Sequence, residues 1–126
     1  MEQTEMKALI ASQQTELDAV LLYQKLASLA KTEEEKQTFM GMAADEGRHG
    51  AILRGITGAD LKPKDTLAKL AGTLYKAGGR KLLLAFMSRF EIESFFSYQK
   101  YFTQYPQIAA IASDEIRHGH LLTEMQ

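Results

Sequence analysis

The strongest constraint on this chain is a repeated pattern of charged residues within apolar helical segments. The motif Asp-Glu-Gly-Arg-His-Gly at 45–50 returns as Asp-Glu-Ile-Arg-His-Gly at 114–119. Each copy is preceded by Glu-x6-Tyr-Gln-Lys, at 16–25 and again at 91–100. A pattern shared by the two halves of a chain indicates a duplicated structural unit. We therefore expect an approximate two-fold axis relating the halves.

The spacing of apolar residues predicts helices along the whole chain. These residues recur at intervals of three and four, and no stretch alternates as a strand would. Thr32 followed by Glu35 has the form of a capping box, which marks a helix start. Long helices are expected at about 4–31, at 32–55, at 80–104 and from Pro106 almost to the chain end.

The connections between these helices predict how they pair. Very short loops join the first two helices and the last two, so each pair should form an antiparallel hairpin. The longer connection, 55–79, contains a short amphipathic helix marked by Leu67, Leu70, Ala71 and Leu74. The predicted fold is therefore an all-α four-helix bundle, built from two antiparallel helical hairpins joined by a long crossover.

Composition excludes several classes of function. The chain has 126 residues, which we interpret as one domain over 1–126, with 15 Lys+Arg against 16 Asp+Glu. This balance provides no basic surface for nucleic acid. The absence of cysteine excludes disulfides, thiolate-bound zinc and a rubredoxin-type iron centre within this sequence. The longest apolar run, 82–87, is far short of the about 20 residues that a membrane span needs, so we expect a soluble, cytoplasmic protein without membrane contact.

Each long helix carries a glutamate in the middle of its apolar stripe. In the third helix, Glu91 shares a stripe with Met87 and Phe95. The corresponding glutamates of the other helices are Glu16, Glu46 and Glu115. Four ionised carboxylates in one core would be prohibitively costly unless positive charge balanced them.

These residue types in this pattern predict a site for two metal ions. Glu and His at i and i+3 share a helix face, so each Glu-x-x-His can give a carboxylate and an imidazole to one site. Two divalent cations would balance the four carboxylates, and two neutral imidazoles would complete the ligand set. Such an oxygen-rich set favours two iron ions, with Mn or Zn as substitutes. The expected metal ligands are Glu16, Glu46, His49, Glu91, Glu115 and His118.

Neighbouring residues are expected to support these ligands. Asp45 and Asp114 precede the motif glutamates, and we expect them to orient a ligating imidazole through its second nitrogen. Tyr23 and Tyr98 follow the first and third glutamates by two helical turns. Their hydroxyls could therefore hydrogen-bond a ligand carboxylate from a facing helix.

Other polar residues have simpler interpretations. A single Glu-x-x-His is more often part of a solvated helix face than a ligand pair, and it is the second copy that favours metal binding. His120 and Asp18 are interpreted as surface residues. Glu93, two positions after Glu91, should also face solvent, unless a π-bulge in the third helix turns it inward as a further metal ligand.

The order of these motifs resembles the rubrerythrin branch of the ferritin-like superfamily over nearly the whole chain. The resemblance implies a ferritin-like bundle, a di-iron site on the six ligands named above, and Tyr23 and Tyr98 as groups beside the metals. Two features depart from the family. Ser94 stands where rubrerythrins usually carry a further glutamate, which leaves Glu93 as an imperfect substitute. The rubredoxin domain that usually delivers electrons is absent from this cysteine-free sequence.

The resemblance implies a di-iron oxidoreductase in which the four glutamates act through the metals. The expected reaction is reduction of hydrogen peroxide, or less readily of dioxygen, with electrons from an external donor such as a rubredoxin. A ferritin-like iron-binding or ferroxidase protein for iron handling is one alternative, and an oxygen-activating di-iron hydroxylase is another. A homodimer is expected, with helix exchange between subunits left open. Whether the protein protects against oxidative stress is open as well.

Overall fold

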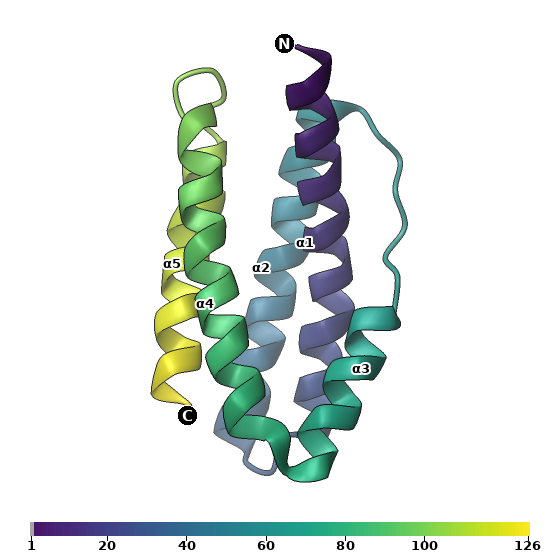
Figure 1. Ribbon diagram of the computed structural model, residues 1–126, viewed down its shortest axis with the longest axis vertical. Helices are drawn as coiled ribbons and strands as arrows, with labels where there is room; N and C mark the ends of the chain where they lie inside the picture. The colour runs from purple at the N-terminus through teal and green to yellow at the C-terminus, as the bar shows by residue number, and fades with distance from the viewer. Residues whose placement is uncertain (1) are drawn as a thin grey trace. The chain divides into compact units, whose positions relative to one another are not determined.

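A computed structural model describes residues 2–126, and these form helices and no strand. Four helices are long, as predicted, and they contact one another as two pairs, which confirms the all-α class. The chain divides into two compact units, one up to Thr73 and the other from Leu74 onward (Figure 1). Each unit contains one helical hairpin, so the duplication seen in the sequence is present in the fold. No helix within 2–126 is long and apolar enough to cross a membrane.

The first unit is built on a hairpin of α1 (Gln3–Leu29) and α2 (Glu33–Thr57), which run side by side in opposite directions (Figure 1). The hydroxyl oxygen of Thr32 accepts a hydrogen bond from the backbone N–H of Glu35 at 3.1 Å, which confirms the predicted start of α2. The predicted end at 55 is wrong. The helix continues to Thr57 because the left-handed residue that stops it is Gly58, at φ 70°.

The crossover after α2 follows α1 in the same direction as α1 itself (Figure 1). The side-chain amide of Gln13 donates to Ala59 O at 3.0 Å, and that of Gln14 donates to Lys62 O at 2.8 Å. Further along, the backbone N–H of Lys64 donates to the carboxylate of Asp18 at 2.8 Å. Asp18 is only partly buried, which is compatible with its interpretation as a surface residue, and it also anchors the crossover.

The short helix in the crossover is present as α3 (Thr66–Leu74), but the leucines that marked it are largely exposed. Its buried residues are small, namely Ala68, Ala71 and Gly72. A side chain at Gly72 would meet the Lys25 stem, so small residues let α3 lie close to that side chain of α1.

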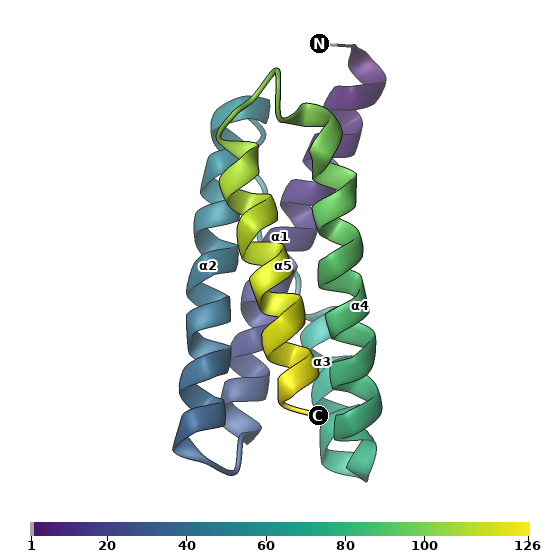
Figure 2. The same cartoon turned by 90° about the vertical axis from the view of Figure 1, so that its left-hand side faces the viewer.

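The second unit contains the hairpin of α4 (Arg80–Tyr98) and α5 (Ile108–Glu124), whose two helices and connecting loop are visible in Figure 2. A kinked turn, η1 (Tyr75–Gly79), in which Gly78 has a left-handed backbone at φ 88°, leads into α4. The predicted bounds of the last two helices, to 104 and from 106, are wrong at this loop. Here α4 passes into a 3₁₀ turn, η2 (Gln99–Tyr101). In the loop that follows, the amides of Phe102 and Ile108 donate to carbonyls three residues back, whereas the amide of Tyr105 donates four residues back, to Tyr101.

Candidate metal centre

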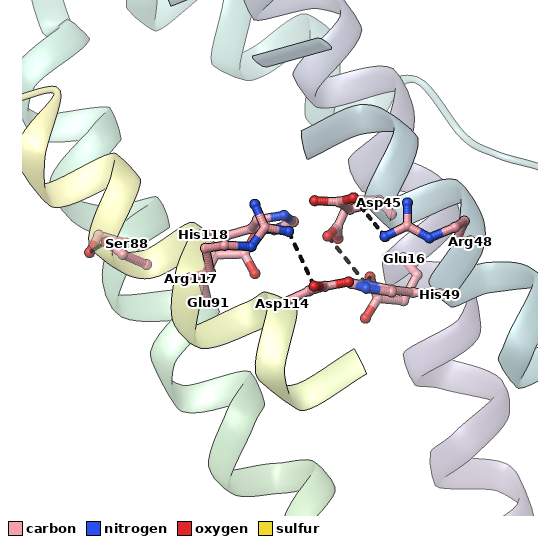
Figure 3. A network of polar contacts seen from close by, with 11 residues as sticks. Glu16, Asp45, Arg48, His49, Ser88, Glu91, Asp114, Arg117 and His118 are labelled. Atoms are coloured by element: carbon pink, nitrogen blue, oxygen red, sulfur yellow. Dashed lines mark hydrogen bonds and ion pairs between the residues drawn. The ribbon is translucent and has the colours of Figure 1, made fainter. Parts of the chain in front are cut away.

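The first unit brings together three of the predicted ligands. Glu16 comes from α1, whereas Glu46 and His49 come from α2, and all three are at most 3% exposed. One ligand atom of each lies within 4.8 Å of the others. The Nδ1 atom of His49 is 3.4 Å from Glu16 Oε2 and 3.4 Å from Glu46 Oε1. Figure 3 shows Glu16 and His49 projecting toward one another from their two helices.

The second unit brings together the other three. Glu91 comes from α4, whereas Glu115 and His118 come from α5, and their exposed fractions are 4%, 2% and 0%. Their ligand atoms also lie within 4.8 Å of one another. The Nδ1 atom of His118 is 3.6 Å from Glu91 Oε1. The six predicted ligands therefore form two clusters of the same composition, one in each hairpin.

The spacing within each cluster suits a metal ion. Two donor atoms that are each about 2.1 Å from one cation lie roughly 3.0–3.4 Å apart for angles between about 90° and 110°. The observed separations of 3.4–3.6 Å between Nδ1 and carboxylate oxygen are close to that range. In both hairpins the Nδ1 atom of the histidine faces a carboxylate of the cluster. The buried Glu and His groups of each hairpin could therefore hold a metal ion.

The final glycine of the repeated motif sets how closely the helices of each hairpin approach. A Cβ atom on Gly50 would lie 2.9 Å from Leu17 Cδ2. A Cβ atom on Gly119 would lie 2.5 Å from Ile92 Cγ1. Leu17 directly follows Glu16 on α1, the helix opposite Gly50. In the same way, Ile92 directly follows Glu91 on α4, the helix opposite Gly119. The glycine thus allows the single-glutamate helix to bring its carboxylate beside the Glu-x-x-His face.

The motif arginine has a structural role that the sequence interpretation missed. Arg48 Nη2 donates to Asp45 Oδ1 at 2.7 Å, and Arg117 Nη2 donates to Asp114 Oδ1 at 3.1 Å (Figure 3). The side chains of Asp45 and Asp114 are only 12% and 22% exposed, whereas both arginines are more than half exposed. The i, i+3 spacing of Asp and Arg in both copies is the signal that could have revealed this pair. The expected contact of each aspartate with an imidazole stays a prediction.

Buried polar residues one turn before two of the ligand glutamates were also missed. Ser88 lies one turn before Glu91, and its hydroxyl donates to Gly119 O of α5 at 2.7 Å. Gln13 lies one turn before Glu16, and its side chain bonds to Thr57 and to Ala59, two residues after α2 ends. Both side chains tie a ligand-bearing helix to its neighbour within the hairpin.

The remaining predicted residues divide into buried and exposed groups. Tyr23 and Tyr98 are 1% and 2% exposed, and the Tyr23 ring stacks on Phe39 at a centroid distance of 6.3 Å. Their predicted bonds to ligand carboxylates stay predictions. Glu93 is exposed and pairs with Arg89 at 3.1 Å, in agreement with its solvent-facing interpretation. The kinked turn η1 lies well before Glu93, and α4 itself is an α-helix throughout. His120 is exposed, as expected.

Comparisons with models of protein families, with curated proteins and with solved structures found no match for this chain. The resemblance to rubrerythrins therefore rests on the motifs alone.

Proposed function

We propose that this chain binds two iron ions and uses them as a dinuclear centre to reduce hydrogen peroxide, with electrons from an external donor protein. The observation that carries the proposal is the repeated buried cluster of two glutamates and one histidine in each hairpin, with ligand atoms within 4.8 Å. Hard carboxylate oxygens with one imidazole for each ion suit iron or manganese better than softer metals. The rubrerythrin-like order of the motifs supports the choice of peroxide as the oxidant.

The charges of the clusters support two divalent ions per chain. Each cluster holds two carboxylates within the buried interior, where an ionised group is costly unless a positive charge balances it. One divalent cation for each hairpin supplies that balance, while the imidazoles stay neutral and bind through Nδ1. The geometry of both clusters is already set by helix packing at Gly50 and Gly119. Little reorganisation of the ligands would therefore accompany metal binding.

Two bound ferrous ions would together supply the two electrons that, with two protons, convert one hydrogen peroxide into two waters. The chain would provide the ligands and hold them in place through the Ser88 and Gln13 contacts. Arg48 and Arg117 would hold the carboxylates of Asp45 and Asp114 in place next to the ligand glutamates. These two carboxylates could then orient the ligand side chains on the same helices. The sequence contains no cysteine, so the electrons must come from a centre outside it.

The first test is metal content and oxidation kinetics of the chain loaded with ferrous iron under anaerobic conditions. We expect close to two iron ions per chain and a Mössbauer spectrum of an exchange-coupled pair after oxidation. In stopped-flow experiments, peroxide should oxidise the ferrous protein faster than dioxygen does. Two magnetically isolated ions would contradict the dinuclear centre, and equal rates with both oxidants would contradict peroxide reduction.

The same experiment separates the proposal from iron handling. A ferritin-like storage function requires a large closed assembly and an iron content that rises far above two per chain when dioxygen is supplied. We expect neither, because the six predicted ligands account for two ions only.

A further inference from the structure

Helix α4 carries apolar residues on two opposite sides. One side is buried and carries Leu84 and Met87 together with the polar Ser88 and Glu91. The opposite side carries Leu82, Phe86, Phe90 and Phe96, whose exposed fractions are 71%, 71%, 51% and 60%. These four residues fall within about a third of the helix circumference at about 100° per residue.

The exposed apolar face of α4, defined by these four residues, is large enough for a stable interface. With about 150–250 Å² of surface for each aromatic side chain, the four residues expose on the order of 500 Å². A standard protein interface buries about 800 Å² per partner, of which roughly 56–65% is apolar. The four side chains thus provide the whole apolar share of such an interface from one helix. An apolar patch of this size is among the largest that a typical monomer exposes, and such patches often mark interaction sites.

The charges within this face point to what covers it. Arg89 and Glu93 lie in the same stripe, 80% and 63% exposed, and they pair with each other at 3.1 Å. In two identical antiparallel helices related by a two-fold axis level with residue 91, residue 89 lies opposite residue 93 of the second helix. Arg89 then meets the partner's Glu93, and Phe86 meets the partner's Phe96. The face is therefore complementary to itself in charge and places aromatic residues opposite aromatic residues, as a self-complementary two-fold interface requires.

We propose that the exposed apolar face of α4 is the surface at which a second copy of this chain packs antiparallel, forming a homodimer. Phe90 lies nearest the two-fold axis, and the Phe86 and Phe96 contacts flank it on both sides. The two Arg89–Glu93 pairs set the register, because a shift by one turn in either direction would break the opposite-charge pairing. The interface goes beyond the proposed function, since it uses none of the metal ligands.

The charge pairing allows a test by complementation. We expect the unaltered chain to sediment as a dimer in analytical ultracentrifugation. Arg89→Glu places two acidic residues opposite two acidic residues, and Glu93→Arg does the same with basic residues, so each should raise the dimer Kd by at least about tenfold. Mixing the two variants should restore a dimer, because the acidic face then meets the basic one. The double variant R89E/E93R should also dimerise like the unaltered chain.

Two further variants separate this interface from others. Phe90→Glu should give a folded monomer, with unchanged helix content by circular dichroism. Met40→Glu removes a 48% exposed apolar residue of α2 and should leave the dimer intact. A chain that stays monomeric at every accessible concentration overturns the proposal. So does a dimer that persists in Phe90→Glu or is insensitive to both charge reversals, which would place the contact elsewhere or show exchanged hairpins.

Discussion

At the scale of single residues, the two clusters divide the polar residues of the motifs into ligands and supports. Only glutamates and histidines supply candidate ligand atoms, whereas the motif aspartate and arginine pair with each other and the motif glycine leaves room for the facing helix. All six ligand residues are at most 4% exposed, which distinguishes them from Glu93 and His120 on the same helices. The burial of these ionisable side chains, more than their residue type, distinguishes the candidate ligands from other Glu and His residues.

Removal of one ligand should abolish metal binding by its cluster. In Glu46→Ala and His118→Ala, one donor of three is lost, so iron bound per chain after anaerobic loading should fall by at least half. Plasma emission spectroscopy on the gel-filtered protein measures this directly. Glu93→Ala is the matched control, because it removes an exposed carboxylate of α4 and should retain full metal content. Unchanged iron in both ligand variants would contradict the assignment.

Neutralising a ligand should stabilise the metal-free protein. Glu46→Gln keeps the shape of the side chain but removes one of two neighbouring buried carboxylate charges, so we expect the free energy of unfolding without metal to rise by about 1–3 kcal/mol. Urea unfolding in the presence of a chelator measures this change. In the presence of iron the order should reverse. A variant less stable than the parent under both conditions would indicate that Glu46 is structural.

At the scale of the elements, helix contacts within each hairpin depend on a few small or polar residues. Gly50 and Gly119 permit close approach, Ser88 bonds across α4 and α5, and Asp18 holds the crossover against α1. These residues lie within one or two turns of a ligand. A change in the packing of a hairpin should therefore move the Glu and His side chains of its cluster and weaken metal binding.

Gly119→Ala should separate α4 from α5. The added Cβ would lie 2.5 Å from Ile92 Cγ1 and 3.3 Å from the backbone oxygen of Ser88, so we expect a loss of about 1–3 kcal/mol in stability and weaker metal binding. Gly41→Ala is the matched control in α2. It meets nothing within 4 Å and should stabilise the protein by about 1 kcal/mol through helix propensity. Thermal unfolding of both variants checks the contrast, and equal effects would contradict it.

The bond from Lys64 to Asp18 should be visible in hydrogen exchange. Asp18→Ala removes the acceptor of the Lys64 amide, so exchange at that amide should become faster, and stability should fall by about 0.5–1.5 kcal/mol. Exchange measured by NMR at single-residue resolution is the appropriate test. Amides in the middle of α4 serve as the internal reference and should be unaffected. An unchanged Lys64 rate would show that the crossover is held by its other contacts.

At the scale of the whole molecule, the chain is two similar hairpins that each carry a complete three-residue cluster. This duplication explains why every feature of the first hairpin's site has a counterpart in the second, from the ligands to the glycine and the Asp–Arg pair. The proposed dimer face is the exception. Phe86, Phe90 and Phe96 correspond by the repeat to positions 11, 15 and 21, which are Ala, Thr and Leu. Only one half of the chain carries that surface.

Metal binding should stabilise the chain as a whole. An ion that binds only the folded state adds about 2.7 kcal/mol when its free concentration is a hundred times its Kd. We therefore expect the melting temperature to rise on loading with ferrous iron and to return to the starting value with a chelator. Calorimetry under anaerobic conditions provides the measurement. Mg²⁺ serves as the control, because a site that contains histidine ligands should bind Mg²⁺ less tightly than iron. No shift with iron, manganese or zinc would contradict metal binding.

The sequence by itself determined the helical class and the pairing into hairpins, and it identified the buried Glu and His residues that could hold metal. It could do so because helix periodicity is local, and because a buried glutamate within an apolar stripe needs a positive charge to balance it. The tertiary structure decided what depends on contacts between distant residues. Asp18 anchors the crossover, Gly50 and Gly119 admit a neighbouring helix, and the leucines of α3 are exposed while its small residues are buried. Spacing along one helix shows which residues share a face, but only the packing of neighbours shows which of those faces is buried.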